Sequence, residues 1–191
     1  TLRYYINTFH KGSIGQDEIT KYSGSSFTFG KMETIQFIQR ICPDRNSRIL
    51  DVGPGRGIYN HLLRDVGYKH FDAVEIYLPY IVHFKLNQIY HQVFHRNIVG
   101  FEYEPYDIIV MGDVLEHLKV RQAKKVIEYA QAHSKLLIVA VPYQLKQIGC
   151  QLDGSGDHKQ SDLTRNVFLK RYPGFELLID NNQLGVFFSK S

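Results

Sequence analysis

The chain has 191 residues, of which 43% are hydrophobic and 22% are charged, and its formal net charge is +4. This length suits one domain with its own hydrophobic core, and the composition is that of an ordinary soluble globule. No apolar run approaches the ~20 residues of a membrane span, we expect no secretory signal, and so mild a charge disfavours nucleic acid as a partner. Cys42 and Cys150 lie far apart, and we interpret them as reduced packing residues of a cytoplasmic protein.

The first predicted helix ends at Pro43. Apolar side chains recur at helical spacing before this proline and predict one face that lies on a sheet. These side chains are Met32, Ile35, Ile38 and Cys42.

A short apolar run with a carboxylate inside it leads into a glycine-rich turn. Residues 49–52 predict a buried strand, and Gly53, Gly55 and Gly57 predict a tight turn before a helix. Glycine is needed where a ligand touches backbone or where φ is positive. Asp51 would repel a pyrophosphate and attract a cation. The glycines also depart from the G-x-G-x-x-G spacing of dinucleotide folds, and no G-K-[ST] follows, which disfavours a nucleoside triphosphate loop.

The stretch I-L-D-V-G-P-G-R-G resembles motif I of the class I S-adenosylmethionine-dependent methyltransferases. S-adenosylmethionine suits this turn, because its methionine moiety carries an ammonium for Asp51 and a carboxylate for the amides and dipole of the helix start. The resemblance also implies that residues 1–29 form a short cap over the cofactor, with a disordered leader as the alternative. The predicted cofactor contacts of this motif are Asp51, Gly53, Pro54, Gly55 and Gly57.

A helix closed by Gly67 leads to a second predicted strand at residues 71–77. Its Glu75 follows Asp51 by 24 positions, about the separation at which an acid meets the ribose in such folds. Two adjacent hydroxyls can both donate to one carboxylate. We therefore predict that Glu75, with its neighbour Ile76, binds the cofactor. The alternative is a solvated acid at the end of a strand.

A helix from Pro79 and a third strand at residues 92–95 come next. In the resembled family, this strand ends in an acid that accepts a hydrogen bond from the adenine amino group. Asn97 stands at the matching place, and its amide oxygen can still accept, with the Ile98 amide available to a ring nitrogen. The predicted inward side chains of the helix are Val82, Leu86 and Ile89.

Residues 106–114 predict a fourth strand, whose β-branched run is typical of a strand buried on both faces. It leads into D-V-L-E-H-L, which resembles a block of small-molecule methyltransferases. The resemblance implies that Asp113 and Val114 lie beside the cofactor, and that Asp113 and His117 lie near its sulfonium and the acceptor. His117 is the better candidate base, because its ordinary pKa of about 6.5 suits proton removal at neutral pH. The alternative is that Glu116 and His117 cap and orient the next helix.

A helix with a basic outer side and a fifth strand at residues 135–143 follow. The basic side is expected to be a solvated surface, and the inward face is formed by Val120, Ala123, Ile127 and Ala130. No D-P-P-Y or N-P-P-Y follows the fourth strand, which disfavours the family's DNA amino-methylating branch. The string V-P-Y-Q also lacks the Asp-Asn pair of the metal-dependent catechol-like enzymes, so we expect no metal.

Residues 144–160 are polar and too long for a plain connection. Such loops beside a site are usually lids or acceptor-binding elements. His158 could orient an acceptor hydroxyl or act as the base in place of His117, and the alternative is an ordinary loop histidine. Asp153, Asp157 and His158 lack the further ligands that would favour a metal cluster.

A last helix and a hairpin close the chain. Ser161 is expected to cap the helix, which stops at Pro173. Residues 175–179 and 184–189 predict two strands around the turn D-N-N-Q. A terminal antiparallel hairpin on a parallel sheet is typical of the methyltransferase fold.

The sequence thus predicts an α/β protein with a Rossmann-like methyltransferase fold: a seven-stranded, mostly parallel sheet, a C-terminal antiparallel hairpin and helices on both faces. One domain spans residues 1–191, with a cap (1–29), a cofactor-binding core (30–143), a lid or acceptor loop (144–160) and a C-terminal helix and hairpin (161–191). We predict an S-adenosylmethionine-dependent methyltransferase that acts on an oxygen of a polar small-molecule or glycan acceptor. The alternatives are an NAD-linked oxidoreductase and a catalytically inactive methyltransferase-like binding protein.

Overall fold

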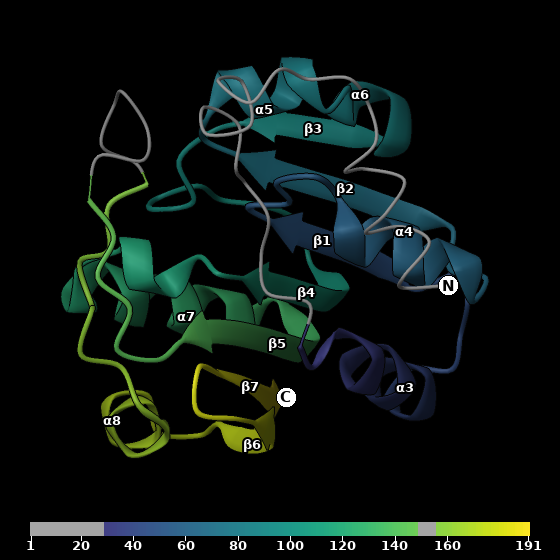
Figure 1. The fold of residues 1–191 in the computed structure, drawn as a ribbon. Coiled ribbons are helices and arrows are strands. Elements are labelled where there is room, and N and C mark those ends of the chain that lie inside the picture. Colours follow the sequence, from purple (N-terminus) through teal and green to yellow (C-terminus); the bar gives the residue numbers. More distant parts are fainter. Residues whose placement is uncertain (1–28, 149–155) are drawn as a thin grey trace.

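A computed structural model describes residues 29–148 and 156–191. Its centre is one sheet of seven strands: β1 (Arg48–Val52), β2 (His70–Glu75), β3 (Gln92–His95), β4 (Tyr106–Gly112), β5 (Ser134–Pro142), β6 (Glu176–Asp180) and β7 (Leu184–Lys190). Their order is β3-β2-β1-β4-β5-β7-β6 (Figure 1). β1 to β5 are parallel, and β7 runs antiparallel between β5 and β6. The predicted sheet and its terminal hairpin are confirmed.

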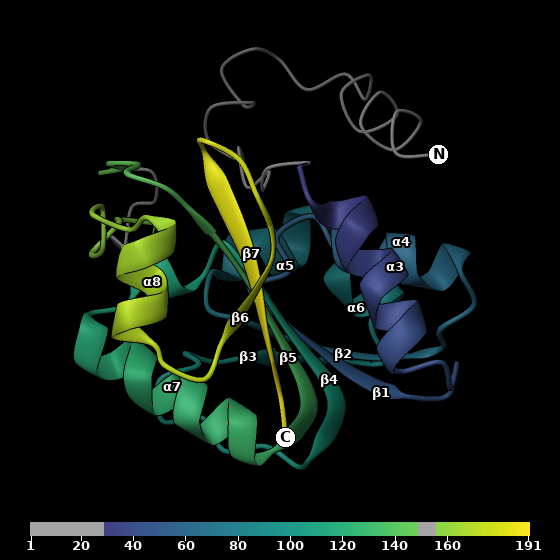
Figure 2. The same cartoon turned by 90° about the horizontal axis from the view of Figure 1, so that it is seen from below.

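Helices cover both faces of this sheet, also as predicted (Figure 2). One face carries α3 (Lys31–Ile41), α4 (Ile58–Asp65), α5 (Leu78–His83) and α6 (Leu86–Ile89). The other face carries α7 (Val120–Ala132) and α8 (Arg165–Arg171). A short 3-10 helix, η1 (Leu115–His117), follows β4 and precedes α7.

The two central strands β4 and β5 are buried on both sides. Residues 108–111 and 136–139 are fully buried, and their side chains alternate between the two hydrophobic clusters. Burying one such aliphatic side chain contributes about 1.5 to 3 kcal/mol. The carboxyl end of β4, where the D-V-L-E-H-L block begins, is therefore held by fully buried strand residues.

The prediction of one continuous helix from Pro79 is wrong, because the chain forms two short helices, α5 and α6, in its place. The chain breaks at Lys85, whose φ is +52°, so α5 and α6 do not form one continuous helix. Val82 is 68% exposed, contrary to the prediction, and Ile81 is buried in its place. Leu86 is buried as expected.

Three further details of the helices differ from the prediction. Met32 lies exposed and Lys31 is buried, although Ile35 and Ile38 face inward as predicted. Val120, the first residue of α7, was predicted to face inward, but it is exposed and lies outside the buried face of this helix. Thr164, and not Ser161, caps α8, because its hydroxyl accepts a hydrogen bond from the Val167 amide.

Some predictions concern residues outside the described ranges. They concern residues 1–28 of the predicted cap and residues 149–155 of the predicted lid, which include Cys150 and Asp153. Cys42 is a partly buried free thiol at the end of α3. Among the helices of residues 29–148 and 156–191, none combines the length and apolarity that crossing a membrane requires.

Candidate functional site

Three acids stand at the carboxyl-terminal edge of the sheet. Asp51 lies in β1, in register with Ala73 of β2 and Val110 of β4. Glu75 is the last residue of β2, and Asp113 directly follows β4. Because these strands are parallel neighbours, they carry all three acids to one edge, which is where open α/β sheets bind ligands.

The glycine turn after β1 has the backbone conformation that its sequence predicts. Gly53, Gly55 and Gly57 adopt φ values of +64°, +52° and +72°. Residues with a Cβ atom rarely adopt such positive values. A Cβ on Gly53 would lie 2.7 Å from Val114 Cγ2, and one on Gly57 would lie 2.7 Å from Ile89 Cδ1. The protein's own packing therefore requires glycine at these two positions, whatever ligand the turn binds.

Asp51 is a buried acid with two unforeseen neighbours. The Tyr90 hydroxyl donates a hydrogen bond of 2.6 Å to Asp51 Oδ2. Burial raises the pKa of Asp51 to about 6, while the Tyr90 bond and the charge of Lys31 oppose this rise. Lys31 is also buried, with its Nζ 4.0 Å from the centre of the Tyr59 ring. Burial lowers the pKa of Lys31 against the opposing charges of Asp113 and Asp51.

Sequence reasoning found neither Tyr90 nor Lys31. Tyr90 follows α6 and lies 39 positions from Asp51, so no local pattern connects the two. Lys31 is the first residue of α3, where a lysine is ordinarily solvated. Only the way α3 lies on the sheet turns this side chain inward.

Glu75 is not the solvated acid of the alternative interpretation, because it is only 4% exposed. Its Oε1 accepts a hydrogen bond of 2.8 Å from the Tyr77 amide. Burial raises the pKa of Glu75 to about 7, and hydrogen bonds from the amides of Tyr77, Gly55 and Ile76 limit that rise. The carboxylate thus bonds both to its own loop and to the glycine turn.

Asp113 has an unusual backbone for a residue with a side chain. Its φ is +57°, and its amide donates to the Ala140 carbonyl oxygen at 3.0 Å. Left-handed conformations at residues other than glycine cost about 1 kcal/mol or more and gather at functional sites. The D-V-L-E-H-L block therefore begins with a strained residue that β5 holds in place.

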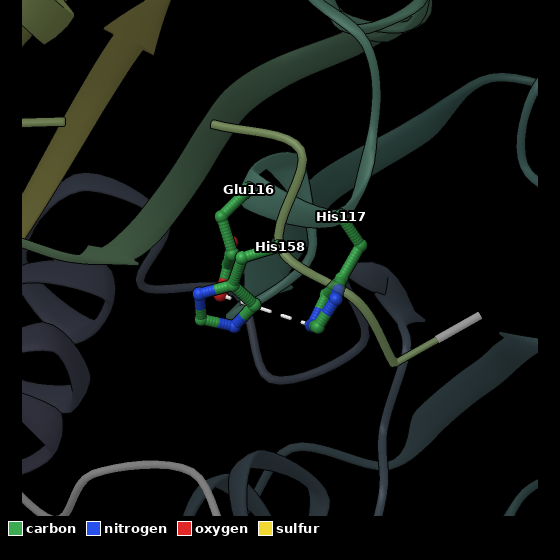
Figure 3. A group of neighbouring side chains, drawn as sticks. All are labelled: Glu116, His117 and His158. Atoms are coloured by element: carbon green, nitrogen blue, oxygen red, sulfur yellow. Dashed lines mark ion pairs between the residues drawn. The ribbon is translucent and has the colours of Figure 1, made fainter. Parts of the chain in front are cut away.

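The structure brings His117, Glu116 and His158 together, although His158 comes from the loop before α8 (Figure 3). The rings of His117 and His158 meet edge to face with centroids 4.7 Å apart. Nε2 of His117 lies 4.0 Å from Oε1 of Glu116. His117 and His158 were predicted as alternative bases, and they are neighbours in space.

Burial governs the protonation of this cluster. Burial and the neighbouring His158 lower the pKa of His117 to about 4, and burial also lowers the pKa of His158. Burial and the charge of Asp113 raise the pKa of Glu116 well above its usual range. Both imidazoles are therefore neutral at pH 7 and able to accept a proton, although so low a pKa makes His117 a weak base.

The interpretation of Glu116 as a helix-capping residue is wrong. At the start of α7, the Gln122 side chain accepts a hydrogen bond of 3.1 Å from the Lys119 amide. Glu116 is 1% exposed, and neither of its carboxyl oxygens has a hydrogen-bond partner within the described ranges. Sequence reasoning weighed this residue only as a cap, because nothing in D-V-L-E-H-L marks its side chain as buried.

The residues predicted for the adenine side lie after β2 and β3. Asn97 Oδ1 accepts a hydrogen bond of 2.9 Å from the Val99 amide, so it already shapes the turn in which it lies. Ile98 is buried, and Ile76 is partly exposed. Contacts of Asn97, Ile98 and Ile76 with a cofactor remain predictions.

Comparison with known proteins gives a family and a set of structural neighbours. A family model described as a methyltransferase domain matches residues 27–183. No curated protein matches the chain. The N-terminal domain of EvdMO1, crystallised in the presence of SAH and D-fucose, has a TM-score of 0.62 and 13% identity, over 95% of this chain and 100% of that one.

Two other solved structures are similar to the same extent. An S-adenosylmethionine-dependent methyltransferase from Clostridium acetobutylicum has a TM-score of 0.62 and 12% identity, over 97% of this chain and 98% of that one. Magnesium protoporphyrin IX methyltransferase from Synechocystis, with bound SAH, has a TM-score of 0.60 and 13% identity, over 97% of this chain and 92% of that one. At these identities the likeness is one of fold. Because the methyltransferase-domain model spans most of the chain, the protein belongs to that family and is a class I methyltransferase with a Rossmann-like fold.

Proposed function

We propose that this methyltransferase moves a methyl group from S-adenosylmethionine to an oxygen atom of a polar small-molecule or glycan acceptor. Its membership of the methyltransferase family accounts for the transferase class and the methyl donor, and it goes against the NAD-linked alternative. The observation that supports the site most strongly is the group of three acids around the glycine turn. The acceptor and the roles of individual residues are the proposed part.

The cofactor would lie across the ends of β1, β2 and β4. Asp51 would bind the ammonium of the methionine moiety, and the Tyr90 hydroxyl would keep its carboxylate oriented. Glu75 would accept from the ribose hydroxyls, since the amides of Tyr77 and Gly55 already hold its carboxylate at the turn. Gly53, Pro54, Gly55 and Gly57 would receive the methionine carboxylate, with Val114 beside them. Asn97, Ile98 and Ile76 would line the adenine side.

The acceptor would lie beside Asp113, His117 and His158. A methyl transfer of this kind is an in-line displacement at the methyl carbon, so the enzyme contributes by holding donor and acceptor in contact and by excluding water. A hydroxyl acceptor loses its proton during the reaction. His117, His158 or Asp113 would take that proton, and a positioned base is worth about 10²- to 10⁴-fold in rate.

Two observations support a polar acceptor that carries hydroxyl groups. The segment that carries His158 is polar, and its described part places the His158 imidazole and the Gln160 side-chain amide beside η1. EvdMO1, which shares the fold, was crystallised with a sugar as well as SAH. We expect the reaction to take place in the cytoplasm, with no nucleic acid or membrane as partner.

The test is methyl transfer from S-adenosylmethionine with a deuterated methyl group to a panel of monosaccharides and polyhydroxylated small molecules. Mass spectrometry should find the label on an acceptor oxygen. A panel of amines and thiols serves as the comparison, and labelling confined to nitrogen or sulfur would refute the oxygen acceptor. If Asp113→Ala, His117→Ala and His158→Ala all methylate at the wild-type rate, none of these residues is the base.

A further inference from the structure

Glu116 is a buried acid whose carboxyl group has no hydrogen-bond partner among the described residues. Its side chain is 1% exposed, and both carboxyl oxygens lack a hydrogen-bond partner among the residues that the structure describes. Buried polar atoms in folded proteins are nearly always hydrogen-bonded, so two such oxygens on one side chain call for a ligand. Two imidazoles lie beside it, from His117 and His158 (Figure 3).

Each imidazole uses its Nδ1 to bond a backbone carbonyl, and Nε2 of His117 lies 4.0 Å from Oε1 of Glu116. Nδ1 of His117 lies 3.3 Å from the Asp157 carbonyl oxygen, and Nδ1 of His158 lies 2.8 Å from the Leu145 carbonyl oxygen. Because a carbonyl oxygen only accepts, each Nδ1 carries the ring proton and each Nε2 keeps a lone pair. Backbone carbonyls orient metal-binding histidines in this way.

Contrary to the expectation of no metal from the sequence, we propose that Glu116, His117 and His158 bind a divalent metal ion beside the acceptor position. This inference rests on the proposed function for its role, but the site itself stands on the geometry of the three side chains. Their ligand atoms all lie within 4.8 Å of one another. A metal with bonds of about 2.1 Å holds its ligands roughly 3 to 3.5 Å apart. Small rotations of the side chains would therefore close the site around an ion.

The ligand set indicates which ions fit. Two imidazole nitrogens and one carboxylate suit Zn²⁺ and the other divalent ions of the first transition row better than Mg²⁺ or Ca²⁺, which prefer oxygen ligands. Three protein ligands also leave a coordination position open, as in catalytic zinc sites. The ion we expect is therefore Zn²⁺, Mn²⁺ or Co²⁺.

The backbone around the three ligands is tied into one unit. The amides of Lys159 and Gln160 donate to the Glu116 carbonyl oxygen at 2.7 and 3.1 Å. The Gln160 side chain donates to the carbonyl oxygens of Leu115 and Leu118 at 2.8 and 3.0 Å. These bonds hold the segment of His158 against η1, so the two histidines keep their places without a metal.

The open position would take an acceptor hydroxyl. The metal would supply Lewis-acid polarisation of that hydroxyl. With His117 and His158 acting as ligands, the hydroxyl proton would pass to Asp113 or to solvent, and the oxygen would form a bond to the methyl carbon as the carbon–sulfur bond breaks. The sulfonium becomes a neutral thioether. The atoms and charges balance with one proton released, and no oxidant is needed.

Metal binding by the full-length chain, with any affinity tag removed, tests the proposal. The chain is dialysed against chelator, then titrated with ZnCl₂, MnCl₂ and CoCl₂, and bound metal is measured by mass spectrometry and calorimetry. The variants are Glu116→Gln and His158→Ala. The matched control is His91→Ala, which removes a histidine whose side chain is 85% exposed.

We expect one equivalent of at least one of these ions in the wild-type chain and in His91→Ala. In Glu116→Gln and His158→Ala the affinity should fall by about a hundredfold or more, since each loses one of three ligands. If Glu116→Gln fails to fold, His158→Ala decides alone, because His158 lies in a surface loop. A folded wild-type chain that binds none of the three ions, or equal affinity in all variants, would overturn the proposal.

S-adenosylhomocysteine binding is measured in the same samples and separates this proposal from the proposed function. A chain that binds this nucleoside but no metal refutes the metal site alone. A chain that binds metal through these residues but no nucleoside refutes the proposed cofactor site alone. Full methyl transfer in the presence of excess chelator would also contradict the metal's role.

Discussion

Replacing Glu75 by glutamine should change cofactor binding and stability in opposite directions. Burial raises the pKa of Glu75 from its ordinary value of 4.5 to about 7. The folded state therefore holds a proton that the unfolded state has lost between these pH values, so stability is greatest at the acid end and falls as pH rises through 7. A difference of roughly 2.5 pKa units corresponds to about 3 kcal/mol.

Glutamine cannot ionise and keeps an oxygen for the Tyr77 amide, but its NH2 group cannot accept a hydrogen bond from the Gly55 or Ile76 amide, which costs about 1 kcal/mol. Glu75→Gln should therefore be more stable than wild type by up to about 2 kcal/mol at pH 8.5 in the absence of ligand. At pH 5.5 the difference should be much smaller. S-adenosylhomocysteine binding should weaken about ten- to a hundredfold, because hydrogen bonds to a charged acceptor are worth about 1.5 to 3 kcal/mol.

Urea unfolding at the two pH values and calorimetry with S-adenosylhomocysteine measure these effects. Glu176→Gln is the matched control, since Glu176 is an exposed glutamate at the start of β6, and it should change neither quantity. Unchanged nucleoside affinity in Glu75→Gln would refute the ribose-binding role. A loss of both stability and affinity would show that the carboxylate is mainly structural.

Three further outcomes follow from the same site. S-adenosylhomocysteine affinity should rise between about pH 5.5 and 7.5. Burial raises the pKa of Asp51 to about 6 and that of Glu75 to about 7, and both acids must ionise to bind the ligand. An affinity that calorimetry finds unchanged over this pH range would contradict the prediction. Tyr90→Phe removes the donor to the acid of β1 and should weaken binding several-fold at pH 7, whereas Tyr68→Phe, which loses a bond to a backbone carbonyl, should not. Gly53→Ala should destabilise the chain by about 2 to 4 kcal/mol in urea unfolding, because its Cβ would clash with Val114. Gly100 also has a positive φ but has open space around it, so Gly100→Ala should cost only about 1 kcal/mol. Equal losses in the two variants would show that the protein relieves the clash with Val114.

The sheet and the placement of the acids could be predicted because their signals are local. The β-branched runs of β4 and β5 need burial on both faces, and few folds bury parallel strands in that way. The glycines after Val52 mark a turn, since only that conformation explains three of them so close together. Once strand order is that of a methyltransferase, Asp51, Glu75 and Asp113 must share one edge.

The bounds of the helices were harder to predict, because tertiary packing overrides local sequence preferences. The break at Lys85 has no proline or glycine to mark it, so a continuous helix fitted the pattern equally well. Thr164 competes with Ser161 as a cap only three positions away. In both cases the local preference is weak, and contacts with the sheet decide the outcome.

The inner residues of the site could not be predicted for a different reason. Lys31 and Glu116 are charged residue types that are rarely buried, so sequence reasoning places them outside. The contact between His117 and His158 joins positions 41 apart through an irregular loop, for which no periodicity exists. Such contacts depend on the whole fold.

The central claim is that the acids around the glycine turn bind S-adenosylmethionine, and calorimetry with S-adenosylhomocysteine and with NADH tests it most directly. We predict saturable binding of S-adenosylhomocysteine at one equivalent per chain, and no heat with NADH. A folded chain that binds NADH and gives no heat with S-adenosylhomocysteine or S-adenosylmethionine would contradict the account.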